Sequence, residues 1–481
     1  MSSAEEGNRG SRFSRRSFIT GAALGVVAGA AAVALPRKIF RDPARPEFLS
    51  EYYINGFWLE TAGFEDKTPN PPLLERKVLA DIAIIGGGFT GLASAYHLAK
   101  RFPSKKIIVL ETARCGFGAS GRNGGQALPV HPVVEDIFEK EGVDAAKKFA
   151  NLTRQGLEII RSYVKDHGVQ CEMEESGVLV LAYKERDMEG LSRSHEIARD
   201  MGRGSRLLSR DEVKRELKSD RYHGGWRLSD GAILNPAKLA LGMKTMVESM
   251  GVQVFERTKV MSLTPGSRVR LETEFGEVQA DAVVIGTNGY TQKLGLFKHR
   301  FAPLCNYVVA TEPLSPAQIE SIGWKGREAI WDTRTEFDYI RLSADNRVVM
   351  GGEHAPYFYG GGLSGGNYKP SIEMLEQSIL KTWPQLEGLK VTHRWGGTMA
   401  FTLNFLPFMG VMGGSKNIYY SLGYSGEGVC FSQLAGKIIS ELYAREESEL
   451  TRLMVVNHLP PRIPSEPLRY AGVNLYERLF K

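Results

Sequence analysis

The spacing of apolar and polar positions predicts a chain that alternates between strands and helices. Residues 81–85 are a short apolar run that ends at three glycines, which indicates a buried strand. From Leu92 to Ala99 the apolar residues recur at helical spacing, so a helix follows that strand. Residues 105–111, KKIIVLE, predict a second strand. Strand, helix and strand in this order are typical of an α/β fold.

Later segments add further elements of both kinds. We expect a helix from Pro236, because Asn235 is a favourable N-cap residue and proline suits the first turn. An alternating strand follows it, and residues 280–290 predict a buried strand with a glycine-bearing turn. The loop 423–428 leads into an apolar helix. Further strands of a mostly antiparallel sheet are predicted within residues 176–183, 306–314 and 338–353.

The length of 481 residues is enough for two interlocked cores. The net charge of +6 is unevenly placed, because residues 1–45 hold eight basic and three acidic residues. The remainder is nearly neutral and has no basic stripe, so we expect no nucleic-acid partner. The four cysteines lie far apart without a C-x-x-C pair, so we predict no metal site and isolated, mostly buried thiols.

The beginning of the chain has the features of an export signal. Arg15 and Arg16 precede residues 18–35, which carry no charge and are weakly hydrophobic for a membrane span. Residues 32–34, Ala-Val-Ala, offer a small-x-small cleavage site. The stretch SRRSFIT resembles the twin-arginine signal, which implies export of a folded protein by the twin-arginine machinery. The alternative is an uncleaved anchor, with membrane association through residues 18–35. We therefore expect a periplasmic protein or one on the outer face of the cytoplasmic membrane.

The strongest motif is G-x-G-x-x-G between the first strand and its helix. Gly86 permits the tight turn, Gly88 lets a pyrophosphate approach the backbone, and Gly91 lets the helix pack on the strand. The free N–H groups of the helix N-terminus then face the phosphates. Glu111 ends the second strand twenty residues after Gly91, where a carboxylate accepts hydrogen bonds from a ribose diol. Together these features predict dinucleotide binding.

The segment 115–127, CGFGASGRNGGQA, is too rich in small residues for an ordinary helix or strand. Its backbone N–H groups are suited to line a cofactor. Arg122 either neutralises a phosphate or forms a surface ion pair.

These motifs together, IIGGGFTGL, VLE and GASGRNGG, resemble the D-amino-acid oxidase-type flavoprotein family. The resemblance covers roughly residues 50–445, is strongest to the gamma-glutamylputrescine oxidoreductase and glycine oxidase branch, and implies FAD. It includes residues 394–443, which are similar to the family's C-terminal flavin-binding signature. The positions that it implies for FAD are Gly86, Gly88, Phe89, Thr90, Gly91, Glu111, Ser120, Arg122, Asn123, Gly124, Gln126, Val260, Trp395, Gly423, Tyr424, Ser425, Gly426 and Gly428.

Two positions depart from the family pattern. An acid is common where Asn404 stands, and histidine is common where Glu427 stands. Because glycines and backbone carry the flavin site, these changes put the substrate in doubt rather than the cofactor. Cys305 and Cys430 lie in segments near the flavin or substrate, but neither has the context of the covalent linkage in the sarcosine oxidase branch. We therefore expect noncovalent FAD.

The resemblance also implies a division into domains. We expect a discontinuous Rossmann-like α/β domain for FAD and a second, α+β substrate domain on a mostly antiparallel sheet. The FAD domain takes residues 78–130, 230–300 and 390–445, and the substrate domain takes 131–229 and 301–389. Residues 1–35 are the leader, 36–77 a linker and lead-in, and 446–481 a proline-rich surface tail.

Candidate substrate residues lie on the predicted antiparallel strands. Arg341 lies on a strand that resembles the glycine oxidase segment bearing a carboxylate-binding arginine, and a guanidinium matches a carboxylate bidentately; a structural ion pair is the alternative. Tyr339 and Tyr307 are candidates for the pocket or for the core, and Trp395 for a flavin neighbour or the core. His131 and His393 are expected to be satisfied structural histidines.

The family oxidises a C–N bond by hydride transfer to flavin N5, and the imine is then hydrolysed. We therefore expect an exported FAD-dependent oxidase of an amine or amino acid that reduces oxygen to hydrogen peroxide. One alternative is a dehydrogenase of the same fold that passes electrons to a quinone or carrier. The other is a flavoprotein that binds FAD without amine turnover.

Overall fold

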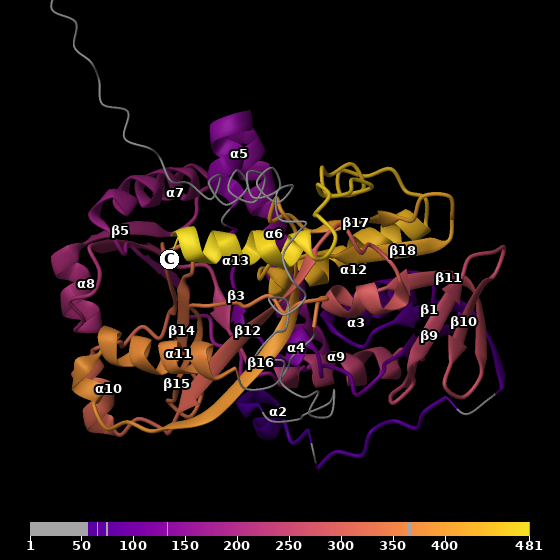
Figure 1. Cartoon of the computed structure of the whole chain (residues 1–481), viewed down its shortest axis with the longest axis horizontal. Helices are drawn as coiled ribbons and strands as arrows, with labels where there is room; N and C mark the ends of the chain where they lie inside the picture. Colours follow the sequence, from indigo (N-terminus) through magenta and orange to yellow (C-terminus); the bar gives the residue numbers. More distant parts are fainter. Residues whose placement is uncertain (1–55, 65, 74–75, 132, 363–367, 481) are drawn as a thin grey trace, which may run out of the picture.

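Two large β-sheets form the two halves of the molecule (Figure 1). The computed structural model describes residues 56–480 except 65, 74–75, 132 and 363–367, so the predicted leader lies outside the described residues. Within the described part of the chain, no helix is both long and apolar enough to cross a membrane.

The first sheet has a parallel centre of buried strands. Its strand order is β17-β18-β11-β1-β2-β8, and β10 extends it from β11 with β9 beyond. The pairs β1–β2, β1–β11, β11–β18 and β2–β8 are parallel, so the predicted Rossmann-like sheet is present. The strands are β1 (Lys77–Ile85), β2 (Ile107–Leu110), β8 (Gln253–Phe255), β9 (Val260–Thr264), β10 (Val269–Thr273), β11 (Glu277–Ile285), β17 (Phe408–Val411) and β18 (Ile418–Leu422).

Helices α3 (Phe89–Arg101), α6 (Val143–His167), α9 (Pro236–Ser249) and α12 (Gly428–Tyr443) pack together beside this sheet. Glycines allow α12 to lie close to α3 and to α6. A Cβ on Gly436 of α12 would lie 2.4 Å from the carbonyl carbon of Ala93 in α3. A Cβ on Gly156 of α6 would clash with the Cys430 carbonyl in α12. The cap of α9 is as predicted, because Oδ1 of Asn235 accepts a hydrogen bond from the Lys238 N–H at 3.1 Å.

The second sheet is mostly antiparallel, as expected, with β13–β4 as a parallel pair. Its order is β16-β12-β15-β14-β13-β4-β6-β5. The strands are β4 (Val178–Leu181), β5 (Ser205–Ser209), β6 (Gly224–Leu228), β12 (Ala302–Thr311), β13 (Ala329–Asp332), β14 (Asp338–Leu342), β15 (Val348–Gly352) and β16 (Val391–Phe401). The accompanying helices are α7 (Met188–Asp200), α8 (Arg210–Leu217), α10 (Pro316–Ile322) and α11 (Lys369–Thr382).

Strand β16 lies in the second sheet, although it falls within the predicted FAD domain. We assigned residues 390–445 to the FAD domain, but β16 pairs with β12 along the whole of that strand, from Ala302 to Thr311. A strand of eleven residues satisfies its backbone groups on a partner of similar length, so it joins the second sheet. The chain crosses to the first sheet only at β17.

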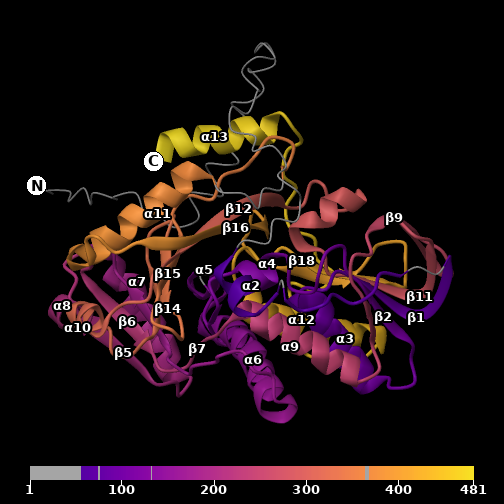
Figure 2. The ribbon, with the colours of Figure 1, turned by 90° about the horizontal axis from the view of Figure 1, so that it is seen from below.

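The remaining elements lie where the two halves meet or on the outside. They are α2 (Phe57–Thr61), α4 (Ala119–Arg122), β3 (Gln126–Ala127), α5 (Val133–Glu141), β7 (Ala232–Ile233) and α13 (Leu468–Phe480). The small-residue segment 115–127 therefore contains one helical turn, α4, where we expected irregular backbone. Figure 2 shows α13 in yellow on the opposite side of β12 and β16 from α9.

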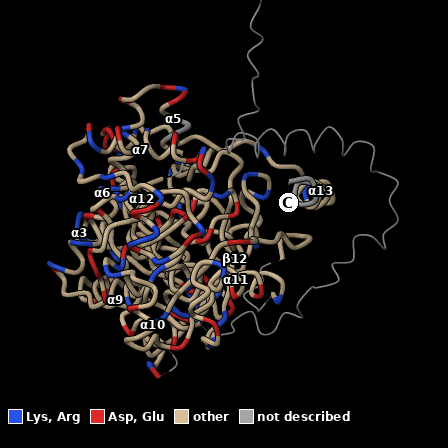
Figure 3. The backbone as a smooth tube through the Cα atoms, turned by 90° about the vertical axis from the view of Figure 1, so that its left-hand side faces the viewer, with Lys and Arg blue, Asp and Glu red and all other residues tan. Residues whose placement is uncertain are grey.

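Charge and cysteine placement agree with the sequence. On the face shown in Figure 3, basic and acidic residues are interspersed rather than gathered in a stripe of one sign. All four cysteines are buried, and none is in a disulfide.

Candidate active site

The turn between β1 and α3 has no room for side chains. Gly86 has a φ of +103°, and a Cβ there would lie 2.9 Å from the Gly286 carbonyl oxygen. A Cβ on Gly91 would lie only 1.9 Å from the Gly86 carbonyl oxygen, so this position can only be glycine if α3 is to pack against the turn. A Cβ on Gly88 would press on the Ser120 hydroxyl, which accepts the Phe89 N–H at 2.8 Å.

A cavity of about 200 Å³ begins at this turn and extends to the loop before α12. It brings together most of the residues predicted to bind FAD, from segments that are far apart in the sequence. Those lining it are Gly86, Gly88, Phe89, Thr90, Glu111, Ser120, Asn123, Val260, Tyr424, Ser425, Gly426 and Gly428. We call this the first cavity.

Glu111 lies in the first cavity at the end of β2. Its carboxylate accepts hydrogen bonds from the N–H groups of Gly87 at 2.7 Å and Ala113 at 2.8 Å, which fix its position. Burial raises the pKa of Glu111, and these two donors oppose the rise. A dinucleotide requires an acidic side chain that accepts hydrogen bonds from its ribose and a turn whose backbone its phosphates can approach. Glu111 and the glycine turn supply these two features. The residues present therefore fit FAD.

A second cavity of about 320 Å³ adjoins the first. The two cavities share the wall residues Ala119, Asn123, Met399, Ser425, Gly426 and Val429. The second cavity continues between β12, β14, β15 and β16 of the antiparallel sheet, where Asn306, Val308 and Tyr339 line it. Its wall is mainly apolar, with a few polar groups, as small-molecule sites usually are.

Tyr339 lines the second cavity, in line with one of the two predictions made for it. Its hydroxyl donates a hydrogen bond to Oδ1 of Asn306 at 3.2 Å. Its ring lies against Gly124 and Gly351, where a Cβ would come within 2.6 Å and 2.5 Å of ring carbon Cε2. Burial raises the pKa of Tyr339 well above that of a free phenol, so the hydroxyl stays protonated.

Arg341, the predicted carboxylate ligand, is not among the residues that line either cavity. Its side chain is completely buried two residues beyond Tyr339 on β14. The guanidinium donates to the carbonyls of Leu234 at 2.5 Å and Gly125 at 3.0 Å, and it lies 4.9 Å from the Trp58 ring centre. Helix α2 and the β3–β7 pair therefore enclose Arg341, which ties these elements to the sheet.

Tyr307 and Trp395 are core residues. Asn306 and Val308 line the second cavity, and Tyr307 lies between them on β12, so strand alternation turns it to the other face. It packs there in the core of the second sheet. Trp395 packs against Trp58, and its indole N–H donates to the Arg122 carbonyl at 2.8 Å. Trp395 thus supports the wall without lining either cavity.

The other predicted FAD positions do not line the first cavity. Arg122, Gly124 and Gln126 line the second cavity, whereas Gly91 and Gly423 line neither. The Arg122 guanidinium is buried, donates to the Phe117 carbonyl at 2.8 Å and lies over the Phe117 ring. Burial lowers its pKa. Arg122 is therefore neither a surface ion-pair residue nor a lining residue of the glycine-turn cavity.

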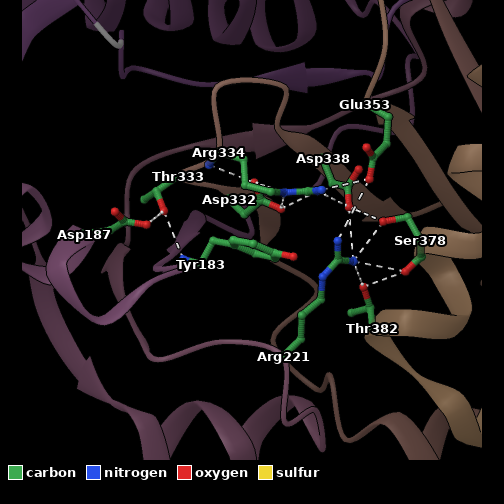
Figure 4. Close-up of polar contacts among 10 residues, drawn as sticks. All are labelled: Tyr183, Asp187, Arg221, Asp332, Thr333, Arg334, Asp338, Glu353, Ser378 and Thr382. Carbon is green, nitrogen blue, oxygen red and sulfur yellow. Dashed lines mark hydrogen bonds and ion pairs between the residues drawn. The ribbon is translucent and has the colours of Figure 1, made fainter. Parts of the chain in front are cut away.

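A buried network of charges supports one wall of the second cavity (Figure 4). Arg334 contacts Asp332 at 2.8 Å, Asp338 at 2.6 Å and Glu353 at 2.9 Å, and Glu353 lines the cavity. Arg221 adds contacts to Asp338 at 3.2 Å and to the hydroxyls of Ser378 and Thr382.

Three carboxylates thus share two guanidinium groups. Burial raises the pKa of Asp338 to about 7 and also raises that of Asp332. Glu353 has a φ of +52° directly after Gly352 at +116°, so the chain turns sharply where β15 leaves the wall. Sequence reasoning missed this network because its members come from β13, β14, α11 and three loops.

The remaining candidates have structural contacts. His131 packs its ring on Phe149 and Phe431, and His393 contacts Glu60 through Nε2 at 3.1 Å. Glu427 lines the second cavity, whereas Asn404 lines neither. Cys305 and Cys430 also line neither cavity, and burial raises the pKa of the Cys430 thiol. The described residues contain no cluster of histidine, cysteine or acidic side chains that could hold a metal ion.

Comparison with known proteins gives a consistent result. Residues 81–442 match the family described as FAD dependent oxidoreductase, DAO. The chain is 33% identical to "Probable oxidoreductase OrdL" of Haemophilus influenzae over 446 residues, which cover 90% of this chain and 99% of the relative. It is also 33% identical to "Gamma-glutamylputrescine oxidoreductase" of Escherichia coli, over 84% of this chain and 95% of the relative. The crystal structure of glycine oxidase from Geobacillus kaustophilus matches with a TM-score of 0.67 at 20% identity, over 79% of this chain and 100% of that one.

Proposed function

The chain belongs to the DAO family of FAD-dependent oxidoreductases, and we propose on this basis that it is an exported oxidase of an amine or amino acid. The substrate loses a hydride from carbon and a proton from nitrogen, and water hydrolyses the resulting imine to a carbonyl compound and either ammonia or, from an N-substituted substrate, an amine. The two electrons pass to oxygen, which becomes hydrogen peroxide. FAD supplies the hydride acceptor at N5 when it is bound.

The observation that carries this proposal is the shared wall of the two cavities. Asn123, Ser425 and Gly426 each line both the cavity that fits FAD and the one enclosed by the antiparallel sheet. A small molecule in the second cavity would therefore lie next to the cavity that fits FAD. The 33% identity to a protein named for gamma-glutamylputrescine supports an amine as the reacting group.

No histidine or lysine is among the described residues that line the second cavity, and its acidic residues are Glu336, Glu353 and Glu427. The Tyr339 hydroxyl keeps its proton and is held by Asn306, so its role is to orient the substrate. The apolar walls exclude water and favour the neutral amine, which is the form that can release a hydride.

The helix dipole of α12 supports the same site. This helix begins at Gly428, and both Gly428 and Val429 line the first cavity. The N-terminus of a helix favours negative charge, and the reduced flavin ring is anionic. FAD bound without a covalent link is part of the proposal, because neither Cys305 nor Cys430 lines a cavity.

Anaerobic flavin bleaching tests the proposal. The chain without residues 1–35 should be yellow, and heating should release its flavin into the supernatant. A panel of primary amines, N-methyl amino acids and amino acids should include one that bleaches the flavin, and air should then give one hydrogen peroxide per amine oxidised. Bleaching without peroxide would identify the dehydrogenase. No bleaching by any amine would overturn amine oxidation, and yellow precipitate after heating would overturn noncovalent FAD.

Export is tested separately through the leader. Replacement of Arg15 and Arg16 by lysine should retain the protein in the cytoplasm with its flavin content unchanged, because the twin-arginine pathway carries folded proteins. Periplasmic recovery of this variant would contradict the twin-arginine assignment. Recovery of the unaltered protein in the membrane fraction, with residues 18–35 still attached, would instead identify the leader as an anchor.

A further inference from the structure

Part of the second cavity is closed by chain that belongs to neither sheet. Residues 460–473, which we call the α13 segment, lead into α13 and include its first turns. Six of its residues line the second cavity and none lines the first: Ile463, Pro464, Leu468, Arg469, Gly472 and Val473. We expected a surface tail here, and nothing in the local pattern of residues 446–481 indicated contact with a site.

The α13 segment is held in place by a buried arginine. The Arg469 side chain donates to the carbonyls of Lys298 at 2.8 Å and Pro464 at 2.9 Å and to the Tyr357 hydroxyl at 3.3 Å. Two further bonds join the segment to the same turn, from the Ile463 N–H to the His299 carbonyl and from Arg300 to the Pro460 carbonyl. These bonds fix the segment against residues 298–300.

A second set of contacts fixes the segment to the loop after β15. The Glu466 carboxylate accepts hydrogen bonds from the Tyr357 hydroxyl and from the N–H groups of Gly360 at 3.3 Å and Tyr470 at 3.2 Å. The Tyr470 ring lies 5.5 Å from that of Tyr359. Because the segment is anchored on two sides, it is a built wall of the cavity and not a loosely attached tail.

Gly472 is the one position in this wall where a side chain would add volume without a clash. A Cβ on Gly472 would have no atom within 4 Å, whereas one on Gly124, in the same cavity, would lie 2.6 Å from the Tyr339 ring. Glycine inside a helix is destabilising relative to alanine. The absence of a side chain at Gly472 therefore leaves open space in the cavity at a cost to the helix.

We propose that the α13 segment is the outer wall of the substrate cavity and that Gly472 determines how large a substituent the substrate can carry beyond its oxidised C–N bond. The inference rests on the proposed amine oxidation and names the part of the chain that selects substrate size. Leucine at this position would occupy space that a long substrate needs and leave the region next to the FAD cavity unchanged. The structure thus assigns a specificity role to a residue outside both sheets.

The first test compares two amines of different length in two variants. Gly472→Leu is measured beside Gly413→Leu, which places the same side chain on an exposed turn where a Cβ also meets no atom within 4 Å. The probes are putrescine and gamma-glutamylputrescine. The half-saturating concentration of each amine is measured from anaerobic flavin bleaching. Gly472→Leu should raise the half-saturating concentration of gamma-glutamylputrescine at least tenfold and that of putrescine less than threefold. Gly413→Leu should change neither. Equal effects on both amines, or none, in Gly472→Leu would overturn the size role.

A second test does not depend on turnover. Because all four native cysteines are buried, Gly472→Cys and Gly413→Cys each introduce one accessible thiol. A bulky dye maleimide should label Gly472→Cys at least tenfold more slowly than Gly413→Cys, whereas a small methanethiosulfonate should label both within threefold. Equal labelling by the bulky reagent would place residue 472 on open surface and overturn the wall. If neither amine bleaches the unaltered protein, the proposed function fails for these substrates, and the labelling alone decides the wall.

Discussion

The Tyr339 hydroxyl donates to Oδ1 of Asn306 across an intervening strand. Tyr339 is on β14 and Asn306 on β12, and Gly351 of the intervening strand β15 is paired with Tyr339 on one side and Val308 on the other. A Cβ on Gly351 would lie 2.2 Å from the phenol oxygen, so the bond exists because this strand position has no side chain. The position of Tyr339 in the second cavity therefore depends on Gly351, a residue that has no side chain of its own.

Replacement of Gly351 by alanine should displace the Tyr339 ring and disturb the cavity without affecting FAD. We expect anaerobic bleaching at least tenfold slower at an unchanged flavin-to-protein ratio. Tyr339→Phe keeps the ring and loses one hydrogen bond worth about 1 kcal/mol, so its loss should be roughly fivefold. A Gly351→Ala variant as active as the unaltered protein would show that the ring position is unimportant.

Alanine at Gly91 should abolish the cofactor site. Its Cβ would lie 1.9 Å from the Gly86 carbonyl oxygen, so α3 would have to move away from the glycine turn. We expect a flavin-to-protein ratio at least tenfold lower after purification, measured from visible absorbance. Gly413→Ala is the matched control, because its Cβ would meet no atom. Normal flavin content in Gly91→Ala would contradict the role given to this turn.

The Arg341→Met variant tests whether Arg341 stabilises the fold or binds the substrate. The substitution removes the arginine bond to the Leu234 carbonyl and one of the two bonds to the Gly125 carbonyl, which still accepts from the Leu234 N–H. A buried carbonyl that loses its partner costs about 1–3 kcal/mol. We expect a lower unfolding temperature and an unchanged half-saturating substrate concentration in the protein that remains folded. A large rise in that concentration for amino acids, with little change for simple amines, would instead restore Arg341 as a carboxylate ligand.

The charge network should make stability depend on pH. Burial raises the pKa of Asp338 from an ordinary value of 3.8 to about 7, so the folded state binds more protons than the unfolded state between these values. The contribution of Asp338 to the free energy of unfolding is fully present below pH 4. It decreases by about 1.4 kcal/mol for each pH unit up to about pH 7 and is absent above that pH. Asp332 acts in the same direction.

Asp338→Asn should therefore flatten this dependence. The measurement is the unfolding temperature of the FAD-saturated protein from pH 5 to pH 8, with Asp211→Asn on the exposed face of α8 as the control. The unaltered protein and Asp211→Asn should lose stability across this range, and Asp338→Asn should lose less. Parallel curves for all three proteins would place the titration elsewhere.

The parts of the site that follow local rules could be predicted from the sequence. The turn Gly86–Gly91 and the cap at Asn235 depend on a few neighbouring residues. Strand alternation likewise shows that Tyr307 and Asn306 face opposite sides of β12. It does not show which side faces the cavity, because that depends on what packs against each face.

Arg341 and the α13 segment show where such reasoning fails. Arg341 shares a strand face with Tyr339, yet α2 and the β3–β7 pair cover it, and their positions are set by contacts more than a hundred residues away. The α13 segment reaches the cavity through bonds to residues 298–300 and 357–360. No local pattern encodes pairings of this range.

The separation of the cavity walls along the chain has a consequence for how the protein is made. The first cavity takes its walls from residues near 86, 111, 120, 260, 287 and 425, and the central strands β1, β11 and β18 come from equally distant segments. A ribosome must release Gly428 and Val429 before the pocket has a complete boundary. A nascent chain still lacking α12 has no finished site, so cofactor capture belongs to the nearly completed polypeptide.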